Sequence, residues 1–242
     1  MKIEVWRSEY KEIEALRERY RQEANCQIVH DSILRRELAD PYLILSDGRV
    51  AGYGGVWNKY DPGRVMEFYT LPCHRAHAQD LFRELLTVSK ATQIEAQTNM
   101  PLMLTMLYDF AESIATESIL FEDAFQTNLP CLNGVFRHTR PGDGDSYADW
   151  GIEVEGKIVA EGGFLCHYNP PYGDVSMSVS EDARRQGLGS YLVQELKRVC
   201  GEAGKRPSAR CNPANIASRR TLQKAGFLPC GRLLAGVISA SE

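Results

Sequence analysis

Two glycines in the chain have a spacing that suits the binding of an anion. They belong to the segment Arg184-Arg185-Gln186-Gly187-Leu188-Gly189-Ser190, which separates a strand-like stretch, 175–179, from a helical one, 191–199. The first N–H groups of a helix have no partner inside the helix, and the helix dipole adds about half a positive charge at that end. Glycines there let an anion approach the bare backbone. The sequence therefore predicts a phosphate site at this strand–helix junction.

A second motif lies downstream, at 215–227, where Asn215 is followed by Lys224-Ala225-Gly226-Phe227. Together the two motifs resemble the GNAT superfamily of acyl-CoA-dependent N-acyltransferases. That family has an Arg/Gln-x-x-Gly-x-Gly/Ala loop, then a helix, a strand, and an Asn…Lys-x-Gly-Phe segment. Both motifs are present here in order, and the resemblance covers roughly residues 149–236.

The resemblance implies that the acyl donor is acetyl-CoA, with its pyrophosphate on the N–H groups of 186–190. It also implies that the strand 177–179 bonds the pantetheine arm and that one of its amides polarises the thioester carbonyl. Arg184 and Arg185 either assist the phosphates, as guanidinium groups do, or are solvated. Asn215 either contacts the cofactor arm or caps a helix. The predicted acetyl-CoA-binding residues are Met177, Ser178, Val179, Arg184, Arg185, Gln186, Gly187, Leu188, Gly189, Ser190, Asn215 and Ser218.

The groups that move protons are less clearly marked. Transfer needs a base for the acceptor ammonium and an acid for the departing thiolate. The family often places a tyrosine acid seven residues after the Asn, but Leu222 stands there, so Ser218 or water would replace it. Glu161, on the preceding strand, is the nearest carboxylate and is either the base or a solvent-facing residue. Other titratable groups are His167 and Glu181, with Glu67 if the two halves share one cleft.

The N-terminal half repeats the pattern of the C-terminal half. Residues 47–55 match 155–163 position by position, 108 residues apart, and 65–86 align with 175–196 after a two-residue shift. Each matched segment begins with an acidic-Gly pair, typical of a hairpin turn. His77 and Gln79 stand where the second copy has Gly187 and Gly189, and their side chains would obstruct a pyrophosphate. We interpret the chain as a tandem repeat whose first copy has lost acyl-CoA binding.

The predicted fold is α/β (α+β), with two GNAT-like halves, each a mixed, largely antiparallel, twisted sheet flanked by helices. We expect a degenerate GNAT-like domain over 1–128 and the catalytic GNAT domain over 129–242. Periodicity predicts helices at 9–23, 31–38, 78–92, 101–115, 190–200 and 215–225. It predicts strands at 2–6, 42–45, 49–57, 64–71, 93–98, 150–154, 157–166, 174–179, 207–211 and 229–238.

The second half lacks a counterpart of the two helices at 9–23 and 31–38, which in the family wall the acceptor pocket. The wall must then come from the loop 140–145, from the first copy or from another subunit. The loop itself is equally well read as a solvated linker.

Composition narrows the function classes. The 242 residues are 43% hydrophobic and 25% charged, and the formal net charge of −4 speaks against a general nucleic-acid binder. No apolar run is long enough for a membrane span and no signal peptide is evident, so we expect a cytoplasmic protein. We interpret the seven scattered cysteines as reduced, mostly buried thiols. Cys73-His74-x-x-His77 is too weak a pattern for a metal site, and none is predicted.

The sequence thus favours an enzyme that transfers an acetyl group from acetyl-CoA directly to a primary amine of a small molecule or peptide. The alternative is a non-catalytic acyl-CoA-binding sensor or scaffold that has kept the cofactor loop and lost the acid. A nucleic-acid-binding protein that uses 218–220 in a recognition helix is disfavoured by the net charge. The acceptor, the acyl group and the oligomeric state are open at this point.

Overall fold

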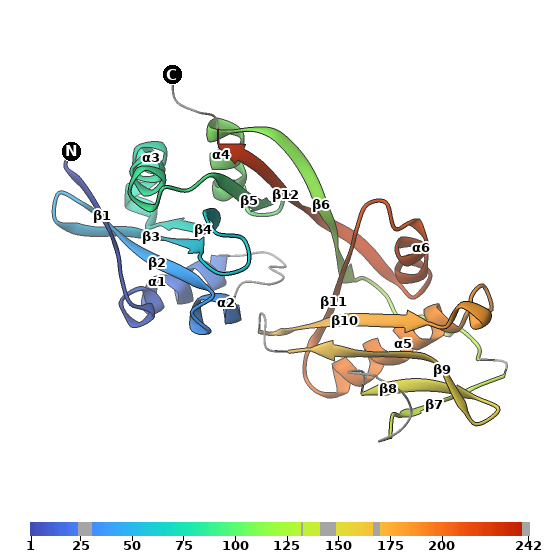
Figure 1. Ribbon diagram of the computed structural model, residues 1–242. Helices are drawn as coiled ribbons and strands as arrows, with labels where there is room; N and C mark the ends of the chain where they lie inside the picture. The colour runs from blue at the N-terminus through green and yellow to red at the C-terminus, as the bar shows by residue number, and fades with distance from the viewer. Residues whose placement is uncertain (24–30, 132, 141–148, 167–169, 239–242) are drawn as a thin grey trace. The chain divides into compact units, whose positions relative to one another are not determined.

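The computed structural model describes residues 1–23, 31–131, 133–140, 149–166 and 170–238 (Figure 1). By their contacts they form two compact units. The first comprises Met1–Glu117 together with Gly231–Glu242, and the second is Ser118–Cys230.

The first unit has a mixed sheet with helices on both faces. Its strand order is β1 (Ile3–Arg7), β2 (Ala39–Ser46), β3 (Arg49–Trp57), β4 (Arg64–Thr70), β5 (Gln93–Gln97) and β12 (Phe227–Ile238). All neighbours are antiparallel except β4 and β5. Its helices are α1 (Tyr10–Glu23), α2 (Asp31–Arg35), α3 (Ala78–Ser89) and α4 (Pro101–Phe110), with the 3-10 turn η1 (Pro72–His77) before α3.

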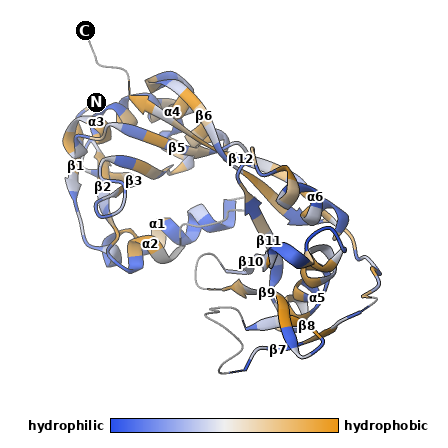
Figure 2. Ribbon diagram, turned by 45° about the vertical axis from the view of Figure 1, so that its right-hand side comes forward, coloured by the Kyte–Doolittle hydropathy of each residue, from blue (hydrophilic) through white to orange (hydrophobic). Residues whose placement is uncertain are grey.

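Two apolar clusters hold this unit together. One gathers residues of α3 and α4 against the sheet, including Leu81, Phe82 and Leu107. The other gathers residues of α1 and α2, including Ile13 and Leu34. Figure 2 shows that α1 is hydrophilic over most of its length, as expected for a helix that buries a single stripe.

The second unit has the strand order β6 (Ala111–Asp123), β11 (Arg206–Cys211), β10 (Tyr172–Val179), β9 (Lys157–Leu165), β8 (Trp150–Val154) and β7 (Val135–His138). Its helices are α5 (Leu188–Glu202) and α6 (Ile216–Lys224), and the turn η2 (Glu181–Ala183) precedes α5. The core lies under α5, where Leu192, Val193 and Leu196 are fully buried. The described part of this unit contains no helix before β8 that would correspond to α1 or α2.

The pairing of β10 with β11 stops early. The two strands are parallel neighbours only from Tyr172↔Arg206 to Asp174↔Ser208. Beyond Asp174, β10 continues beside β9 as far as Val179, and β11 continues beside β6 as far as Cys211. The two strands therefore separate beyond Asp174, and the edge of β10 that faced β11 is left without a strand partner.

The tandem repeat is confirmed. β3 and β9 occupy positions 108 residues apart, and α3 and α5 begin at Ala78 and Leu188, which reproduces the two-residue shift. The turns that precede β3 and β9 have the same backbone: φ is 48° and 74° at Asp47 and Gly48, and 49° and 78° at Glu155 and Gly156.

Two strands were not predicted. The helix expected at 101–115 ends at Phe110, and β6 begins at Ala111; the short strand β7 falls where no element was predicted. Residues 111–123 are rich in Ala and Glu, which favour helix intrinsically. Pairing of Ile119 to Glu122 with β11 overrides that preference.

The halves exchange their closing strands. β12 ends the chain's second repeat, but from Leu233 to Val237 it pairs with β5 of the first unit. β6 follows the last helix of the first repeat, and its second half pairs with β11 of the second unit. Over the described residues the twelve strands follow one hydrogen-bonded order, in which β12 is next to β6. The compact units accordingly divide at 117/118 and 230/231, whereas the sequence suggested a single boundary after 128.

Candidate functional site

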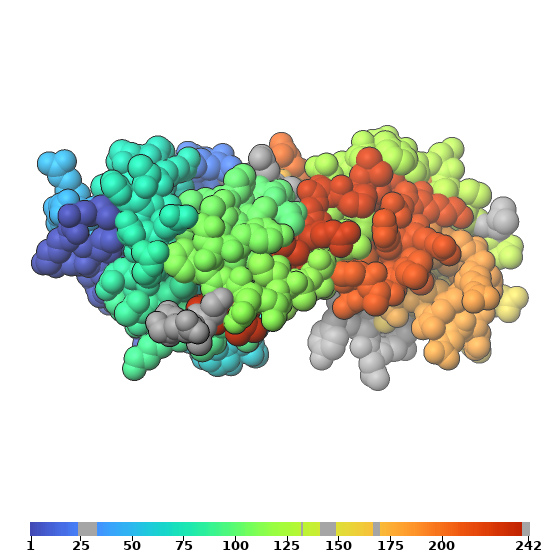
Figure 3. All heavy atoms as spheres, turned by 90° about the horizontal axis from the view of Figure 1, so that it is seen from above, coloured from blue at the N-terminus to red at the C-terminus, as the bar shows by residue number. Residues whose placement is uncertain are grey.

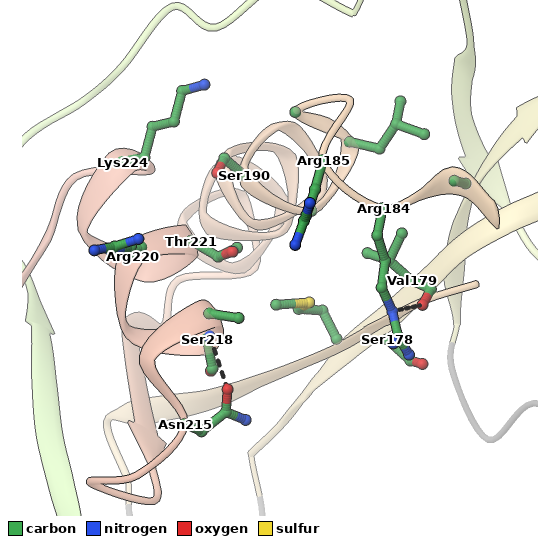
Figure 4. Close-up of a pocket in the computed structure, with 16 residues that line it drawn as sticks. Ser178, Val179, Arg184, Arg185, Ser190, Asn215, Ser218, Arg220, Thr221 and Lys224 are labelled. Atoms are coloured by element: carbon green, nitrogen blue, oxygen red, sulfur yellow. Dashed lines mark hydrogen bonds between the residues drawn. The ribbon is translucent and has the colours of Figure 1, made fainter. Parts of the chain in front are cut away.

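The second unit has an open cleft of about 740 Å³ between β10, the loop before α5, the start of α5 and α6 (Figure 4). Of the residues predicted to bind acetyl-CoA, those that line it are Met177, Ser178, Val179, Arg184, Arg185, Gly187, Leu188, Gly189, Ser190, Asn215 and Ser218. The side chain of the remaining one, Gln186, turns back and donates to the carbonyl oxygen of Asp182 at 3.3 Å. Nearly the whole predicted set therefore lies on one surface.

The start of α5 opens directly onto this cleft. Gly187 precedes the helix with φ of 84°, a left-handed conformation that favours glycine. No side chain of the described residues caps the helix, and Tyr191 N donates to the carbonyl oxygen of Gly187 at 3.1 Å. The N–H groups of the first turn therefore need a partner from outside the helix, and an anion suits them.

Gly189 lies where space for a side chain is tight. A Cβ atom at this position would lie 3.3 Å from Cγ2 of Val179 and 3.4 Å from Cγ2 of Thr221. These contacts are tighter than ordinary van der Waals distances, so glycine lets α5 pack closely against both β10 and α6. The walls of the cleft meet at this residue.

The two arginines before α5 lie differently. Arg184 donates from Nε to the carbonyl oxygen of Val179 at 3.2 Å, and its Nη1 is 3.6 Å from Glu181. Arg185 adopts a left-handed backbone with φ of 64°, and Figure 4 shows its side chain projecting into the cleft. Arg185 is thus placed to meet an anion, and Arg184 also holds the loop to β10.

α6 supplies the opposite wall, and it lies at the surface in Figure 3, where it is coloured in red tones. Asn215 caps it, since its Oδ1 accepts a bond from Ser218 N at 3.0 Å, and it lines the cleft as well. Both alternatives considered for Asn215 are therefore compatible with its position. Sequence reasoning missed further lining residues on this helix: Ala217, Arg220, Thr221 and Lys224. Their spacing of three and four marks one helix face, which was the signal that could have found them.

A buried lysine holds the far end of α6. Lys197 donates to the carbonyl oxygens of Phe125 at 2.9 Å and Ala225 at 2.8 Å, and its Nζ is 2.5 Å from Oδ1 of Asp123. Gly226, with φ of 90°, has no room for a Cβ, which would lie 2.1 Å from the carbonyl oxygen of Phe125. Gly226 therefore ends α6, and the bonds from Lys197 on α5 fix the end of α6 relative to α5.

A smaller cavity of about 280 Å³ adjoins the cleft where β10 and β11 separate. Its lining residues are Leu165, Asp174, Val175, Ser176, Met177, Arg210, Ser218 and Leu222. Met177 and Ser218 also line the larger cleft, so these two residues form a wall that both spaces share. Sequence reasoning missed this cavity, because it depends on where the pairing of two strands stops.

Asp174 is the acidic group of the smaller cavity. The residue is buried, and among the described residues its Oδ1 has no hydrogen-bond partner. Its Oδ2 lies 3.4 Å from Nε of Arg210. Burial raises the pKa of the Asp174 carboxyl, and the positive charge of Arg210 opposes that shift only in part.

The other predicted catalytic residues have varied surroundings. Ser218 lines both cavities. Glu161 pairs with Ser178 across β9 and β10 and lines neither of them. Glu181 is exposed on η2, while His167 and the loop 141–145 lie outside the described residues.

Glu67 of the first unit is held in a buried ion pair. Nε of Arg17 donates to its Oε2 at 2.9 Å and Nη2 to its Oε1 at 2.5 Å. The hydroxyl of Tyr53 donates to the same Oε2 at 2.8 Å. All three residues are completely buried. A carboxylate bound in this way serves the packing of α1 on the sheet and is not accessible to an acceptor.

Two further observations concern metals and membranes. In the described ranges, no group of three or more His, Cys, Asp or Glu side chains is arranged to hold a metal ion. None of the described helices is long and apolar enough to cross a membrane.

Comparison with known proteins relates both halves to one family. The family model described as "Acetyltransferase (GNAT) domain" matches residues 9–124, and the one described as "Acetyltransferase (GNAT) family" matches residues 110–227. A search of curated proteins found no match.

Several solved structures are similar in fold. An acetyltransferase of the GNAT family from Colwellia psychrerythraea is 15% identical, with a TM-score of 0.76 over 99% of this chain and 100% of that one. A tandem GNAT protein from the clavulanic acid biosynthesis pathway is 13% identical, with a TM-score of 0.60 over 100% of both chains. A GCN5-related N-acetyltransferase from Sphaerobacter thermophilus is 13% identical, with a TM-score of 0.60 over 99% and 97%.

These identities establish likeness of fold, and the family models extend it to both halves of the sequence. The cleft at the start of α5, the separation of β10 from β11 and the repeated architecture agree with them. The chain belongs to the GNAT family of acetyltransferases and carries two GNAT domains in tandem.

Proposed function

We propose that this protein is an N-acetyltransferase that moves an acetyl group from acetyl-CoA to a primary amine, with the donor bound in the cleft of the second unit. One observation carries the proposal: the uncapped start of α5, with Gly187 in a left-handed conformation, opens onto the cleft between β10 and α6. A diphosphate placed there would receive the N–H groups of the first turn.

The remaining walls suit the rest of the donor. Beyond Asp174 the edge of β10 has no strand partner, so its backbone groups there are available to the amides of a pantetheine arm. Arg185 faces the cleft, and Arg220 and Lys224 are exposed on its α6 side, where they would meet phosphate groups. Acetyl-CoA, as the donor substrate, supplies the thioester; these residues bind and orient it.

The matching positions of the first unit do not form an equivalent phosphate site. His77, which matches Gly187, has φ of −112°, and Gln79, which matches Gly189, is bonded from Nε2 to Oδ2 of Asp109 at 2.7 Å. Without the left-handed turn and with side chains at both positions, the backbone approach to a diphosphate is obstructed. We therefore expect one acetyl-CoA per chain.

Direct transfer, with no acyl-enzyme, agrees with the position of the thiols. The described cysteines are free, and none of them lines the cleft or the smaller cavity. Burial raises the pKa of Cys200 to about 12, so this thiol is protonated and weakly nucleophilic at neutral pH.

Calorimetry on two matched variants tests the donor site. Gly187→Glu places a side chain and a negative charge on the proposed phosphate seat, and we expect it to weaken acetyl-CoA binding at least tenfold, about 1.4 kcal/mol. Gly204→Glu is the control, because Gly204 also has positive φ, 70°, with open space around it, and does not line the cleft. Two binding sites per chain, or equal affinity in both variants, would refute the assignment.

A non-catalytic acyl-CoA sensor is the second possibility, and the apolar Leu222 at the position of the family's usual acid is the observation that favours it. Release of free thiol from acetyl-CoA, measured with a library of amines, separates the two. Thiol release that depends on an added amine supports the enzyme. Tight acetyl-CoA binding without amine-dependent release supports the sensor.

A further inference from the structure

The geometry points to the smaller cavity as the acceptor site, with Asp174 as the group that receives the proton of the acceptor ammonium. This inference rests on the proposed N-acetyltransferase function and deepens it. It also names the acceptor class: a compact primary amine with a single positive charge.

The position of Asp174 in the sheet is the first argument. It is the last residue of β10 that pairs with β11, so its carboxyl lies where the two strands begin to separate. The cavity in front of it shares Met177 and Ser218 with the donor cleft. The attacking nitrogen is the one that gives its proton to Asp174, so the thioester carbonyl must lie about 3 Å from that nitrogen. The acyl end of the donor would therefore have to extend from Met177 back to the point where β10 and β11 separate.

The unsatisfied oxygen is the second argument. Oδ1 of Asp174 is buried with no hydrogen-bond partner among the described residues, an arrangement that is unfavourable unless a ligand completes it. An ammonium group supplies both the missing donor and the opposite charge.

Among the described residues, Arg210 is the other titratable group on the cavity wall. Its Nε is 3.4 Å from Oδ2 of Asp174, beyond the usual length of a charge-assisted hydrogen bond. Burial raises the pKa of Asp174 more than the positive charge of Arg210 lowers it, so the pKa stays raised. A carboxylate with a raised pKa is a stronger base, closer to what removing an ammonium proton requires.

The lining defines the acceptor class. Leu165, Val175 and Leu222 supply an apolar part of the lining, and the volume of about 280 Å³ admits only a small molecule or a single side chain. Asp174 offers one negative charge, and Arg210 beside it repels a second positive charge on the acceptor. A compact monoamine fits these conditions and a polyamine does not.

The acceptor ammonium gives one proton to the Asp174 carboxylate, and the freed nitrogen lone pair forms a C–N bond with the thioester carbonyl carbon. The C–S bond breaks, and its electron pair leaves on sulfur, which takes a second proton from the amine nitrogen. The products are the amide and the CoA thiol, and Asp174 returns its proton to solvent.

The experiment compares full-length Asp174→Asn with the wild type in acetyl-CoA affinity and in the pH dependence of amine-dependent thiol release. We expect the variant to bind acetyl-CoA within about twofold of the wild type, which shows that it is folded, and to lose about 10²-fold or more in kcat. The rise of activity with pH that reports the base should vanish with it. Glu202→Gln removes a negative charge on the exposed far end of α5 and serves as the control with unchanged activity.

Two further variants exclude a merely structural role. Arg210→Gln removes the charge that lowers the pKa of Asp174, so the rise of activity should move to higher pH. Asp174→Glu keeps the carboxyl group and should restore part of kcat. Monoamines should be acetylated with kcat/KM at least tenfold above that of polyamines of similar length.

The outcomes separate this inference from the proposed function. A wild type that binds acetyl-CoA but acetylates no amine refutes the proposed function itself. A wild type that acetylates amines, together with an Asp174→Asn variant of unchanged kcat and pH profile, refutes the role of Asp174 alone. Loss of the pH dependence in Glu161→Gln and not in Asp174→Asn would assign the base to β9 instead.

Discussion

At the scale of the residue, the two units contain buried carboxylates, Glu67 and Asp174, that differ in how fully they are hydrogen-bonded. Glu67 in the first unit is fully paired by Arg17 and Tyr53. Asp174 in the second unit is nearly as buried, but one of its oxygens has no partner in the described structure. Burial without full pairing raises a carboxyl pKa, and perturbed groups of this kind gather at functional sites.

The raised pKa of Asp174 predicts a gain in stability on its removal. A group whose pKa is higher in the folded state contributes stability below its unfolded pKa, about 3.9, and that contribution is lost as pH rises through the folded value. At neutral pH the buried carboxylate therefore weakens the fold. We expect Asp174→Asn to melt at a higher temperature than the wild type at pH 7, with the difference shrinking toward pH 4. Thermal denaturation between pH 3 and 8 measures this, and a lower melting temperature at pH 7 would contradict it.

At the scale of the element, the helix α6 presents a basic face to the cleft in which we propose that acetyl-CoA binds. Arg220 and Lys224 lie one turn apart and line it, whereas Arg219 is on the same helix and does not. Opposite charges at such exposed sites contribute modestly and are screened by salt. The sequence showed a run of basic residues here without showing which of them face the cleft.

Charge reversal on α6 tests this face. We expect Arg220→Glu and Lys224→Glu each to weaken acetyl-CoA binding severalfold at low salt, with a smaller effect at high salt. Arg219→Glu changes the same charge on the same helix and should have little effect. Calorimetry at two ionic strengths measures the difference, and an equal loss in all three variants would mean that only the overall charge matters.

How far the sequence predicts the site depends on how local each signal is. Gly187 could be singled out because a Gly-x-Gly pair at a strand–helix junction is a local pattern; its φ is left-handed, and its part in binding a phosphate stays a prediction. Asp174 was not readable as part of a site, since its burial depends on β9, β10 and β11 together. β6 was missed for a related reason: Ala and Glu favour helix, and only its partner strands make it a strand.

At the scale of the whole molecule, the exchanged strands tie each half to the other half's sequence. A fragment of residues 129–242 lacks β6, so β11 loses its neighbour, and it carries β12 without β5. Exposed strand edges of this kind promote association between chains. We expect the fragment to aggregate or to be inactive, as measured by size-exclusion chromatography and acetyl-CoA binding. A monomeric fragment with wild-type affinity would show that the exchange is dispensable.

The position of β12 also sets an order of events during synthesis. Residues 1–117 leave the ribosome first, yet their sheet lacks its closing strand until 231–238 have been made. Contacts between such distant segments form late, because a long loop must close before they are gained. A ribosome that stops anywhere before the last strand therefore releases a chain with β5 uncovered, which exposes an incomplete protein to the proteases that remove unfinished products. Closure of the first unit therefore waits until 231–238 have been made.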